Sequence, residues 1–228
     1  MLSAAQIADR LATQHDASQE GRLVIRPSPD QDTLRASGSA SVDLRLGTWF
    51  STMRQSKMSL LRIGDELAEL AANASLSPTQ LKQVSEYVRG TISANEANLT
   101  KTSYIPFGEG FVLHPGNFVL GVTLEWIRLP NNIAGYVIGK SSWGRRGLII
   151  ATAVGVHPNF TGCLTLELTN VAEVPIAIKP GMSICQLFLH EVAETSMPKI
   201  RSPYSCTRRP ALGQLHLDDF AKRLSRGV

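Results

Sequence analysis

Cysteine is scarce in this sequence, and the spacings that would make it a metal ligand are missing. The 228 residues contain three cysteines, Cys163, Cys185 and Cys206, and no two of them form a C-x-x-C pair. A disulfide framework is therefore not expected, and a reducing, cytoplasmic compartment fits this cysteine usage. Zinc deaminases need a Pro-Cys-x-x-Cys pair in addition to a His or Cys beside a Glu, so we expect no zinc site.

Long apolar runs and the commonest catalytic signatures are missing as well. No run approaches the roughly 20 apolar residues that a membrane helix needs, and the first residues lack the basic and apolar regions of a signal peptide. The sequence also has no P-loop, no G-x-G-x-x-G and no G-x-S-x-G elbow. We therefore expect neither a membrane protein nor a member of the enzyme classes that those motifs mark.

The charge of the chain is concentrated at its C-terminal end. The formal net charge is +4, from 23 basic and 19 acidic residues, and residues 201–228 hold six of the basic and two of the acidic ones. The preceding 200 residues are balanced. A basic tail on a neutral body can bind nucleic acid or reach a polyphosphate ligand, but a solvated tail has the same composition. On charge alone these alternatives stay open.

Hydrophobic periodicity predicts a mainly β chain with a few helices. A helix is expected over residues 3–14, with a capping box between Ser3 and Gln6, whereas Asp30 to Gly38 reads as turns. A helical hairpin is expected within 57–93, its second helix beginning with Ser77-Pro78-Thr79-Gln80, and a weak helical stripe follows at 217–224. The remaining segments are short strands separated by turns, expected at 23–25, 42–46, 111–113, 118–126, 134–138, 164–169, 176–178 and 184–189. Such strands favour an antiparallel barrel or a jelly-roll-like sandwich.

Two segments of the strand region carry candidate chemistry. Residues 139–147 place three cations, two hydroxyls and three glycines in nine residues, a set of donors suited to phosphate oxygens. In 164–168 the leucines are expected on one strand face, and Thr165 and Glu167 on the other. Each signal is weak by itself, because a basic Gly/Ser turn is often only a turn and a lone strand Glu is usually solvated.

Six segments in order resemble one family, the dCTP deaminases of the trimeric dUTPase superfamily. The resemblance covers about half of the chain, chiefly residues 22–50 and 104–191. It implies a distorted antiparallel, jelly-roll-like β-barrel that assembles as a homotrimer with active sites between subunits. It also implies Mg²⁺ bound with the nucleotide triphosphate, and no zinc or other protein-held metal. The segments are 41–47, 111–116, 121–125, 139–147, 164–170 and 180–187.

The resemblance also assigns roles to single residues, for the deamination of dCTP to dUTP and ammonia. Glu167 would be the general base and acid, Ser141 would orient the water or the leaving amine, and Arg145 would hold the glutamate. Lys140 and Ser142 would grip the triphosphate. The backbone near Ala153, Thr165 and Leu166 would read the base, and Phe160 would pack against the deoxyribose.

The sequence departs from the family in two places. His157 stands where related dUTPases have an aspartate that supports the hydrolytic water and the sugar, which argues against dUTPase activity and against the bifunctional deaminase–dUTPase variant. Asn159 replaces a glycine and can adopt the same left-handed conformation. In the tail, the residues that could close over the phosphates are Tyr204, Arg208, Arg209 and Gln214, although their order and spacing differ from the family pattern.

These observations give a single dUTPase-like domain over 1–228, with a helical insertion at 51–103 and a basic tail at 192–228. The favoured function is that of a dCTP deaminase in the cytoplasm, with dCTP and dUTP as ligands and dTTP as a possible inhibitor. A non-catalytic or regulatory deoxynucleotide-binding protein on the same fold is the alternative. A dUTPase is disfavoured by His157, and nucleic-acid binding through the tail is the most distant reading.

Overall fold

The computed structural model describes residues 1–12, 21–53, 77, 79–80, 100–193 and 206–212. The chain divides into two compact units, the first made of Met1–Thr52 and Thr102–Ala211 and the second of Met53–Lys101 and Leu212–Val228. Almost all described residues belong to the first unit. Most of the predicted helical hairpin and the whole stripe at 217–224 lie outside the described residues.

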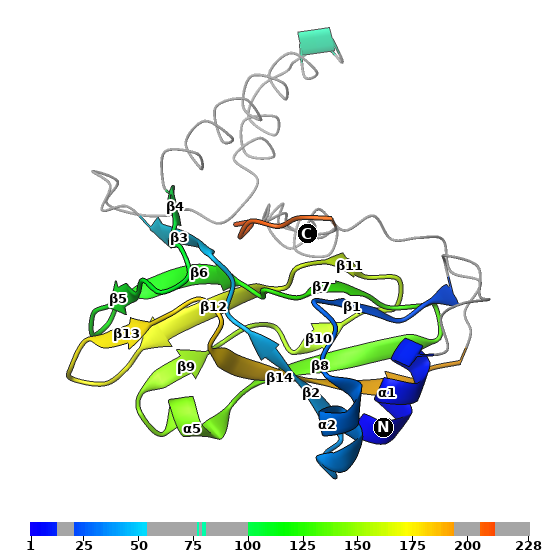
Figure 1. Cartoon of the computed structure of the whole chain (residues 1–228). Coiled ribbons are helices and arrows are strands. Elements are labelled where there is room, and N and C mark those ends of the chain that lie inside the picture. Colours follow the sequence, from blue (N-terminus) through cyan, green and yellow to red (C-terminus); the bar gives the residue numbers. More distant parts are fainter. Residues whose placement is uncertain (13–20, 54–76, 78, 81–99, 194–205, 213–228) are drawn as a thin grey trace, which may run out of the picture. The chain divides into compact units, whose positions relative to one another are not determined.

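Antiparallel strands make up most of the first unit (Figure 1). In the five-stranded sheet the order is β4 (Thr100–Tyr104), β3 (Trp49–Met53), β6 (Phe118–Val122), β12 (Thr165–Asn170), β9 (Leu148–Ile150). In the four-stranded sheet it is β10 (Gly155–Val156), β8 (Ile133–Gly139), β14 (Ser183–Glu191), β2 (Ser41–Arg45). A three-stranded sheet joins β1 (Val24–Arg26), β7 (Trp126–Arg128) and β11 (Thr161–Gly162), and a two-stranded sheet joins β13 (Ile176–Ile178) and β5 (Phe111–Leu113). The predicted mainly β, antiparallel class is confirmed.

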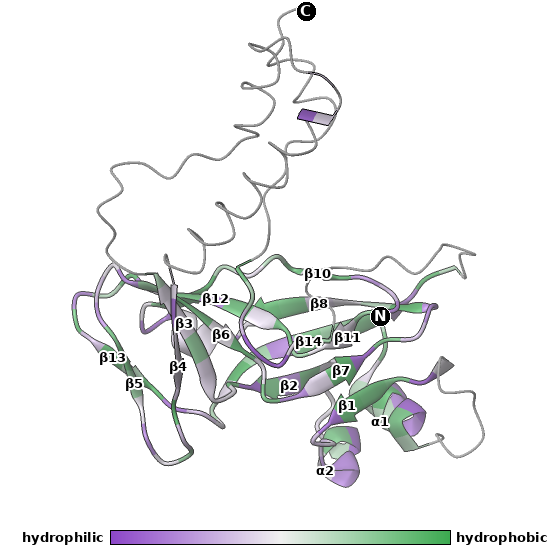
Figure 2. Ribbon diagram, turned by 90° about the horizontal axis from the view of Figure 1, so that it is seen from above, coloured by the Kyte–Doolittle hydropathy of each residue, from purple (hydrophilic) through white to green (hydrophobic). Residues whose placement is uncertain are grey.

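One hydrophobic core cluster joins buried residues of these sheets with those of the N-terminal segment, and strand alternation explains its larger part. On β12 the burial alternates residue by residue, so that Leu166 and Leu168 are fully buried while Thr165 and Glu167 are half-buried on the other face. The green strands in Figure 2 show the same concentration of hydrophobic residues in the sheets. The predicted orientation of this strand is confirmed.

Two helices at the N-terminal end follow from local capping signals. Helix α1 (Ala4–Ala12) begins with the predicted capping box, in which the Ser3 N–H donates to Gln6 Oε1 at 2.9 Å and the Gln6 N–H donates to Ser3 Oγ at 3.2 Å. Helix α2 (Gln31–Ala36) was not expected, because the sequence predicted only turns there. Asp30 caps it by accepting a hydrogen bond from the Thr33 N–H. Figure 2 shows α2 as largely hydrophilic, which hides a helix from hydrophobic periodicity.

The region predicted as a helical insertion begins and ends in strands. Strands β3 and β4 occupy residues 51–53 and 100–103 at the two ends of the range 51–103. Between them the described residues are few. The predicted capping box at the second helix is present, since the Ser77 N–H donates to Gln80 Oε1 at 3.0 Å and the Gln80 N–H donates to Ser77 Oγ at 3.4 Å.

One predicted strand, at 118–126, is two strands in the structure. Strand β6 ends at Val122 and β7 begins at Trp126. The Thr123 hydroxyl donates to the Glu125 carbonyl oxygen at 2.9 Å and accepts from the Leu164 N–H at 2.9 Å. The Thr123 backbone N–H still donates to the Leu164 carbonyl oxygen at 2.9 Å, so the regular pairing ends only after this residue. Among the described residues, no helix has the length and apolar content that crossing a membrane requires.

Candidate functional site

Glu167 lies in the middle of β12, and its backbone is held from one side by the segment that follows β9. The Ala151 N–H donates to the Glu167 carbonyl oxygen at 2.8 Å, and the Glu167 N–H donates to Thr152 Oγ1 at 2.8 Å. The side chain is half-buried and, within the described part of the chain, makes no hydrogen bond or ion pair. Because the Glu167 backbone is fixed and its carboxylate has no partner among the described residues, the carboxylate is available to bind a ligand.

The basic turn predicted as a phosphate-binding segment contains one helical turn, α5 (Ser141–Gly144). Ser141, Ser142 and Arg145 are exposed, and the Arg145 N–H donates to the Ser141 carbonyl oxygen at 2.9 Å. Gly147 closes the turn with φ +86°, and a Cβ there would lie 2.5 Å from the Ala172 Cβ. Glycine is therefore required at Gly147 both by its dihedral angle and by this close approach.

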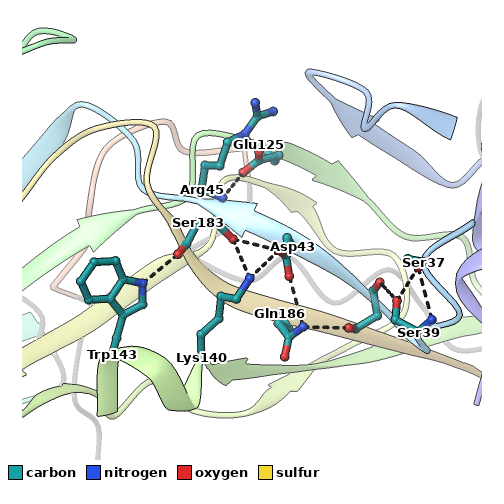
Figure 3. A network of polar contacts seen from close by, with 10 residues as sticks. Ser37, Ser39, Asp43, Arg45, Glu125, Lys140, Trp143, Ser183 and Gln186 are labelled. Carbon is teal, nitrogen blue, oxygen red and sulfur yellow. Dashed lines mark hydrogen bonds and ion pairs between the residues drawn. The ribbon is translucent and has the colours of Figure 1, made fainter. Parts of the chain in front are cut away.

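Lys140 connects this turn to a network of polar side chains on β2 and β14 (Figure 3). Its Nζ donates to Asp43 Oδ2 at 2.5 Å and to Ser183 Oγ at 3.2 Å. The Ser183 hydroxyl also donates to Asp43 Oδ2, at 3.0 Å, and Gln186 Nε2 donates to Asp43 Oδ1 at 3.1 Å. The predicted phosphate-binding lysine therefore already has a carboxylate partner in its own chain.

The electrostatics of Asp43 follow from the same contacts. Partial burial by itself raises the pKa of this carboxyl group. The hydrogen bonds from Lys140, Ser183 and Gln186 and the charge of Lys140 outweigh that effect, so the pKa lies below its ordinary value of 3.8. Asp43 is consequently ionised at neutral pH and holds Lys140 in place.

A cavity of about 260 Å³ opens next to this network. Its deepest charged group is Glu125, which is only 2% exposed and accepts from the Arg45 N–H at 2.8 Å and from Arg45 Nε at 2.7 Å. Both oxygens of Glu125 are thereby used within the chain. The other walls come from β1, β2, β14 and the segment before α2: Ile25, Pro27, Ser28, Pro29, Asp30, Val42, Asp43 and Ser183.

Of the residues expected to read the base and sugar, Ala153, His157 and Phe160 lie between β9 and β12. Thr165 and Leu166 lie in β12 itself, where Thr165 is half-buried and Leu166 is fully buried. Ala153 and His157 are exposed, and Phe160 packs partly buried against the core. The Phe160 N–H donates to the His157 carbonyl oxygen at 3.2 Å, which closes the turn. Asn159 has φ 64°, so the predicted left-handed conformation at this position is confirmed.

The C-terminal segment 206–212 runs alongside β11 and the start of β12. The Cys206 N–H donates to the Thr161 carbonyl oxygen at 2.6 Å, the Cys163 N–H donates to that of Thr207 at 3.0 Å, and the Ala211 N–H lies 3.5 Å from Thr165 Oγ1. The C-terminal segment can lie this close to β11 because Gly162 has no side chain. A Cβ at this position would be 3.2 Å from the Cys206 nitrogen.

Two arginines of this segment stack on tryptophans that the sequence did not single out. The Arg208 guanidinium carbon is 5.2 Å from the centre of a Trp126 ring, and that of Arg209 is 4.3 Å from a Trp49 ring. Arg208 was expected over a phosphate, and in this structure it covers an indole. Tyr204 and Gln214, the other expected tail contacts, lie outside the described residues.

The structure brings the candidate residues together only in part. Within the described residues of one chain, no hydrogen bond or ion pair joins the Glu167 side chain to Ser141 or Arg145. No group of three or more His, Cys, Asp or Glu side chains that could hold a metal occurs in the same part of the chain. Burial raises the pKa of the Cys163 thiol to about 11 and that of Cys185 to about 12, so both stay protonated at neutral pH.

Sequence reasoning missed three partners of the candidate site: Asp43, Thr152 and Trp49. Asp43 stands inside a segment that carried the family resemblance, and that position was its only signal. Thr152 and Trp49 had no distinguishing pattern. All three act through contacts between residues far apart in the sequence.

Comparison with known proteins agrees with the resemblance of the motifs. A dCTP deaminase of Halorubrum lacusprofundi is 35% identical over 227 residues, which cover 99% of this chain and 90% of the relative. A dUMP-forming dCTP deaminase of Dictyoglomus thermophilum is 36% identical over 211 residues, or 90% of this chain and 92% of the relative.

Among solved structures, the 2'-deoxycytidine 5'-triphosphate deaminase of Agrobacterium tumefaciens matches with a TM-score of 0.51 at 19% identity. The match covers 82% of this chain and 45% of that one, and at this identity it supports the fold alone. A model of the dCTP deaminase-like family matches residues 1–192. The chain therefore belongs to the dCTP deaminase-like family.

Proposed function

We propose that this protein catalyses the hydrolytic deamination of dCTP, in which dCTP and water give dUTP and ammonia. The observation that carries the proposal is Glu167, a half-buried carboxylate on a fixed strand whose side chain has no partner among the described residues. The carboxylate takes a proton from water as the oxygen attacks C4 of the cytosine. It then passes protons to the ring nitrogen and to the departing amine, so that one group serves as base and acid in turn.

Ser141 and Arg145 complete the site in this proposal, and they come from another copy of the chain. Ser141 orients the water or the leaving amine, and Arg145 balances the charge that develops at Glu167. In one chain neither contacts the Glu167 side chain among the described residues. A homotrimer with shared sites supplies the missing contacts.

An apolar surface on the four-stranded sheet supports such an assembly. Tyr136 and Ile138 of β8 are 44% and 50% exposed, and Phe188, which pairs with Tyr136 across to β14, points to the same side. Exposed apolar side chains that are contiguous on a sheet face indicate an interface between proteins. We expect this face to be covered by a second copy.

The triphosphate would bind at the basic turn, through Lys140, Ser142 and the exposed arginines there. In this proposal Mg²⁺ binds together with the phosphates, as the family resemblance implies. Mg²⁺ would neutralise phosphate charge, whereas the proton transfers stay with Glu167.

The product is the point on which the relatives divide. The Dictyoglomus thermophilum relative is named as dUMP-forming, and the Halorubrum lacusprofundi relative is not. His157 occupies the position at which the resemblance expects an aspartate for pyrophosphate release. We therefore propose dUTP as the product, with dUMP formation as the second candidate because several relatives carry that name.

The first experiment is a product analysis. The purified protein is incubated with Mg²⁺ and dCTP, CTP, dCMP or dUTP, and the nucleotides are separated by chromatography. We expect dUTP and ammonia from dCTP alone. Formation of dUMP from dCTP would establish the second candidate, and release of pyrophosphate from dUTP would show that His157 does not prevent it.

A non-catalytic nucleotide-binding protein is the remaining alternative. It predicts no product from any of the four nucleotides, together with tight binding of dCTP in a parallel titration. The same titration with dTTP asks whether a thymidine nucleotide competes, as an inhibitor would. Tight binding without turnover would replace the proposed reaction by a regulatory role.

A further inference from the structure

The hydrogen-bond ladder between β9 and β12 changes at one residue, Glu167. In the register of these strands, Leu168 pairs with Ile150, so Glu167 stands opposite Ala151. An antiparallel pair of this kind exchanges two backbone hydrogen bonds. One is present, from the Ala151 N–H to the Glu167 carbonyl oxygen at 2.8 Å. For the other, the Glu167 N–H donates to the Thr152 hydroxyl at 2.8 Å instead of to a backbone carbonyl.

The chain leaves the five-stranded sheet directly after Thr152, whose hydroxyl takes the place of the backbone acceptor. The Val154 carbonyl oxygen accepts from the Val137 N–H at 2.8 Å, and Gly155 pairs with Tyr136 of β8. Residues 151–154 therefore pass from the five-stranded to the four-stranded sheet beside Glu167. A continued ladder would keep this segment on β12. The Thr152 side chain satisfies the Glu167 N–H while the backbone departs. On this side of β12 the pairing of Glu167 ends at Ala151, whereas on the other side Glu167 pairs with Leu120 of β6.

We infer that Thr152 is a positioning residue for deamination, and that its hydroxyl fixes the backbone from which the Glu167 carboxylate projects. This inference rests on the proposed function of Glu167. Thr152 acts through Glu167 alone and carries no proton in the reaction. Proton transfer is sensitive to the placement of the transferring group, so loss of the hydroxyl lowers the rate of the chemical step more than it weakens binding.

The test compares three variants of the full chain in steady-state deamination of dCTP. Thr152→Val keeps the shape of the side chain and removes the acceptor, and Thr152→Ser keeps the acceptor. We expect Thr152→Val to lower kcat about 10- to 100-fold while KM for dCTP stays within about threefold. Thr152→Ser restores most of the lost kcat.

The matched control is Thr169→Val, at a position two residues after Glu167 on β12. The Thr169 hydroxyl donates to the Asn117 carbonyl oxygen at 3.1 Å, and among the described residues it makes no hydrogen bond to Glu167. This variant loses one hydroxyl hydrogen bond from β12, and its kcat remains that of the unmodified protein. If Thr152→Val and Thr169→Val have the same kcat, or if Thr152→Ser is as slow as Thr152→Val, the positioning role is wrong.

A second measurement does not depend on turnover or on the variants folding. Amide hydrogen exchange of the unmodified protein should show the Glu167 N–H protected like its neighbours on β12, and rapid exchange at Glu167 would overturn the inference. Failure of the proposed function looks different, because the unmodified protein would then release no ammonia from dCTP. With active unmodified protein and an unaffected Thr152→Val variant, only the inference fails.

Discussion

The tripeptide Thr-Leu-Glu occurs twice in this chain, at 123–125 and at 165–167, and the two copies have opposite environments. Glu125 is 2% exposed, and both of its oxygens accept hydrogen bonds from Arg45. Glu167 is half-buried, and its side chain has no partner in the described part of the chain. One glutamate is committed to structure, and the other is left available to a ligand.

The difference shows that tertiary partners, rather than the local sequence, decide what a strand glutamate does. The Thr123 hydroxyl donates to the Glu125 carbonyl oxygen just past the end of β6, and the Glu125 carboxylate accepts from Arg45. Thr165 stays in the ladder opposite Val122, and Glu167 stays on the outer face of β12. A buried carboxylate needs a cation and hydrogen bonds, whereas a catalytic one must keep its lone pairs free until substrate arrives.

The largest effect should separate the two glutamates by activity. Glu167→Gln removes the proposed proton carrier without changing its shape, and we expect dCTP turnover to fall about 10³-fold with an unchanged melting temperature. Glu125→Gln is the matched control, and its folded fraction should retain turnover. Ammonia release measures both. Turnover in Glu167→Gln as high as in the unmodified protein would show that Glu167 is not a catalytic residue.

In stability, the Glu125 variant should be affected more than the Glu167 variant. Glu125→Gln loses the charge that binds the Arg45 guanidinium, and we expect the free energy of unfolding to fall by about 1.5–3 kcal/mol. Glu167→Gln removes no contact among the described residues, so its change should stay within about 0.5 kcal/mol. Urea unfolding at one fixed protein concentration measures both values. A large loss in Glu167→Gln would reveal a structural partner for that carboxylate.

The threonines of the two copies offer a smaller contrast. Thr123 is buried, and its hydroxyl makes two hydrogen bonds, so Thr123→Val should cost about 1–2 kcal/mol of unfolding free energy. Among the described residues, the Thr165 hydroxyl accepts one long bond, from the Ala211 N–H at 3.5 Å. Thr165→Val should therefore remain within about 0.5 kcal/mol of the unmodified protein. Thermal unfolding of the two variants measures this difference. A larger loss of stability in Thr165→Val than in Thr123→Val would contradict the environments described for the two threonines.

The smallest predicted effect is that of Asp43 on the pH dependence of unfolding. Like Glu167 the Asp43 side chain is accessible to solvent, and like Glu125 it accepts hydrogen bonds. Its pKa in the folded chain is below the ordinary 3.8, so ionised Asp43 stabilises the fold at pH values above 3.8. This contribution is lost as the pH falls below that value through the folded pKa. Asp43→Asn should flatten this part of the pH dependence of unfolding. An unchanged curve would mean that the bond to Lys140 adds no stability in solution.

Local signals in the sequence were enough for part of the fold. The alternation over 164–169 predicted which side of β12 faces the core, and the capping boxes at Ser3 and Ser77 are present. Helix α2 was missed because it has six residues and only Leu34 is buried, which is too short a stretch for a helical period to be recognised. The end of β6 was missed because apolar and polar residues continue to alternate past Val122 as far as Trp126.

The candidate site was less predictable, because its contacts span long distances in the sequence. The alternation of apolar and polar residues in β12 predicted the face of the strand on which Glu167 lies. No pattern indicated that the Thr152 hydroxyl would accept from the Glu167 N–H in place of a backbone carbonyl. Lys140 was assigned from a basic turn, and its partner Asp43 is 97 residues away. Hydrophobic periodicity carries no information about such pairs, so the sequence alone could not foresee that Lys140 has a partner.

The C-terminal segment makes the intrinsic fluorescence of this protein informative. The chain has three tryptophans, and two of them, Trp49 and Trp126, lie under the guanidinium groups of Arg209 and Arg208. The third, Trp143, donates its indole N–H to the Ser183 carbonyl oxygen at 2.9 Å, next to the Lys140 network. Undocking of residues 206–212 would therefore change the emission of two indoles and spare the third. Replacing Trp143 by phenylalanine leaves a label-free optical reporter of where the C-terminal segment lies.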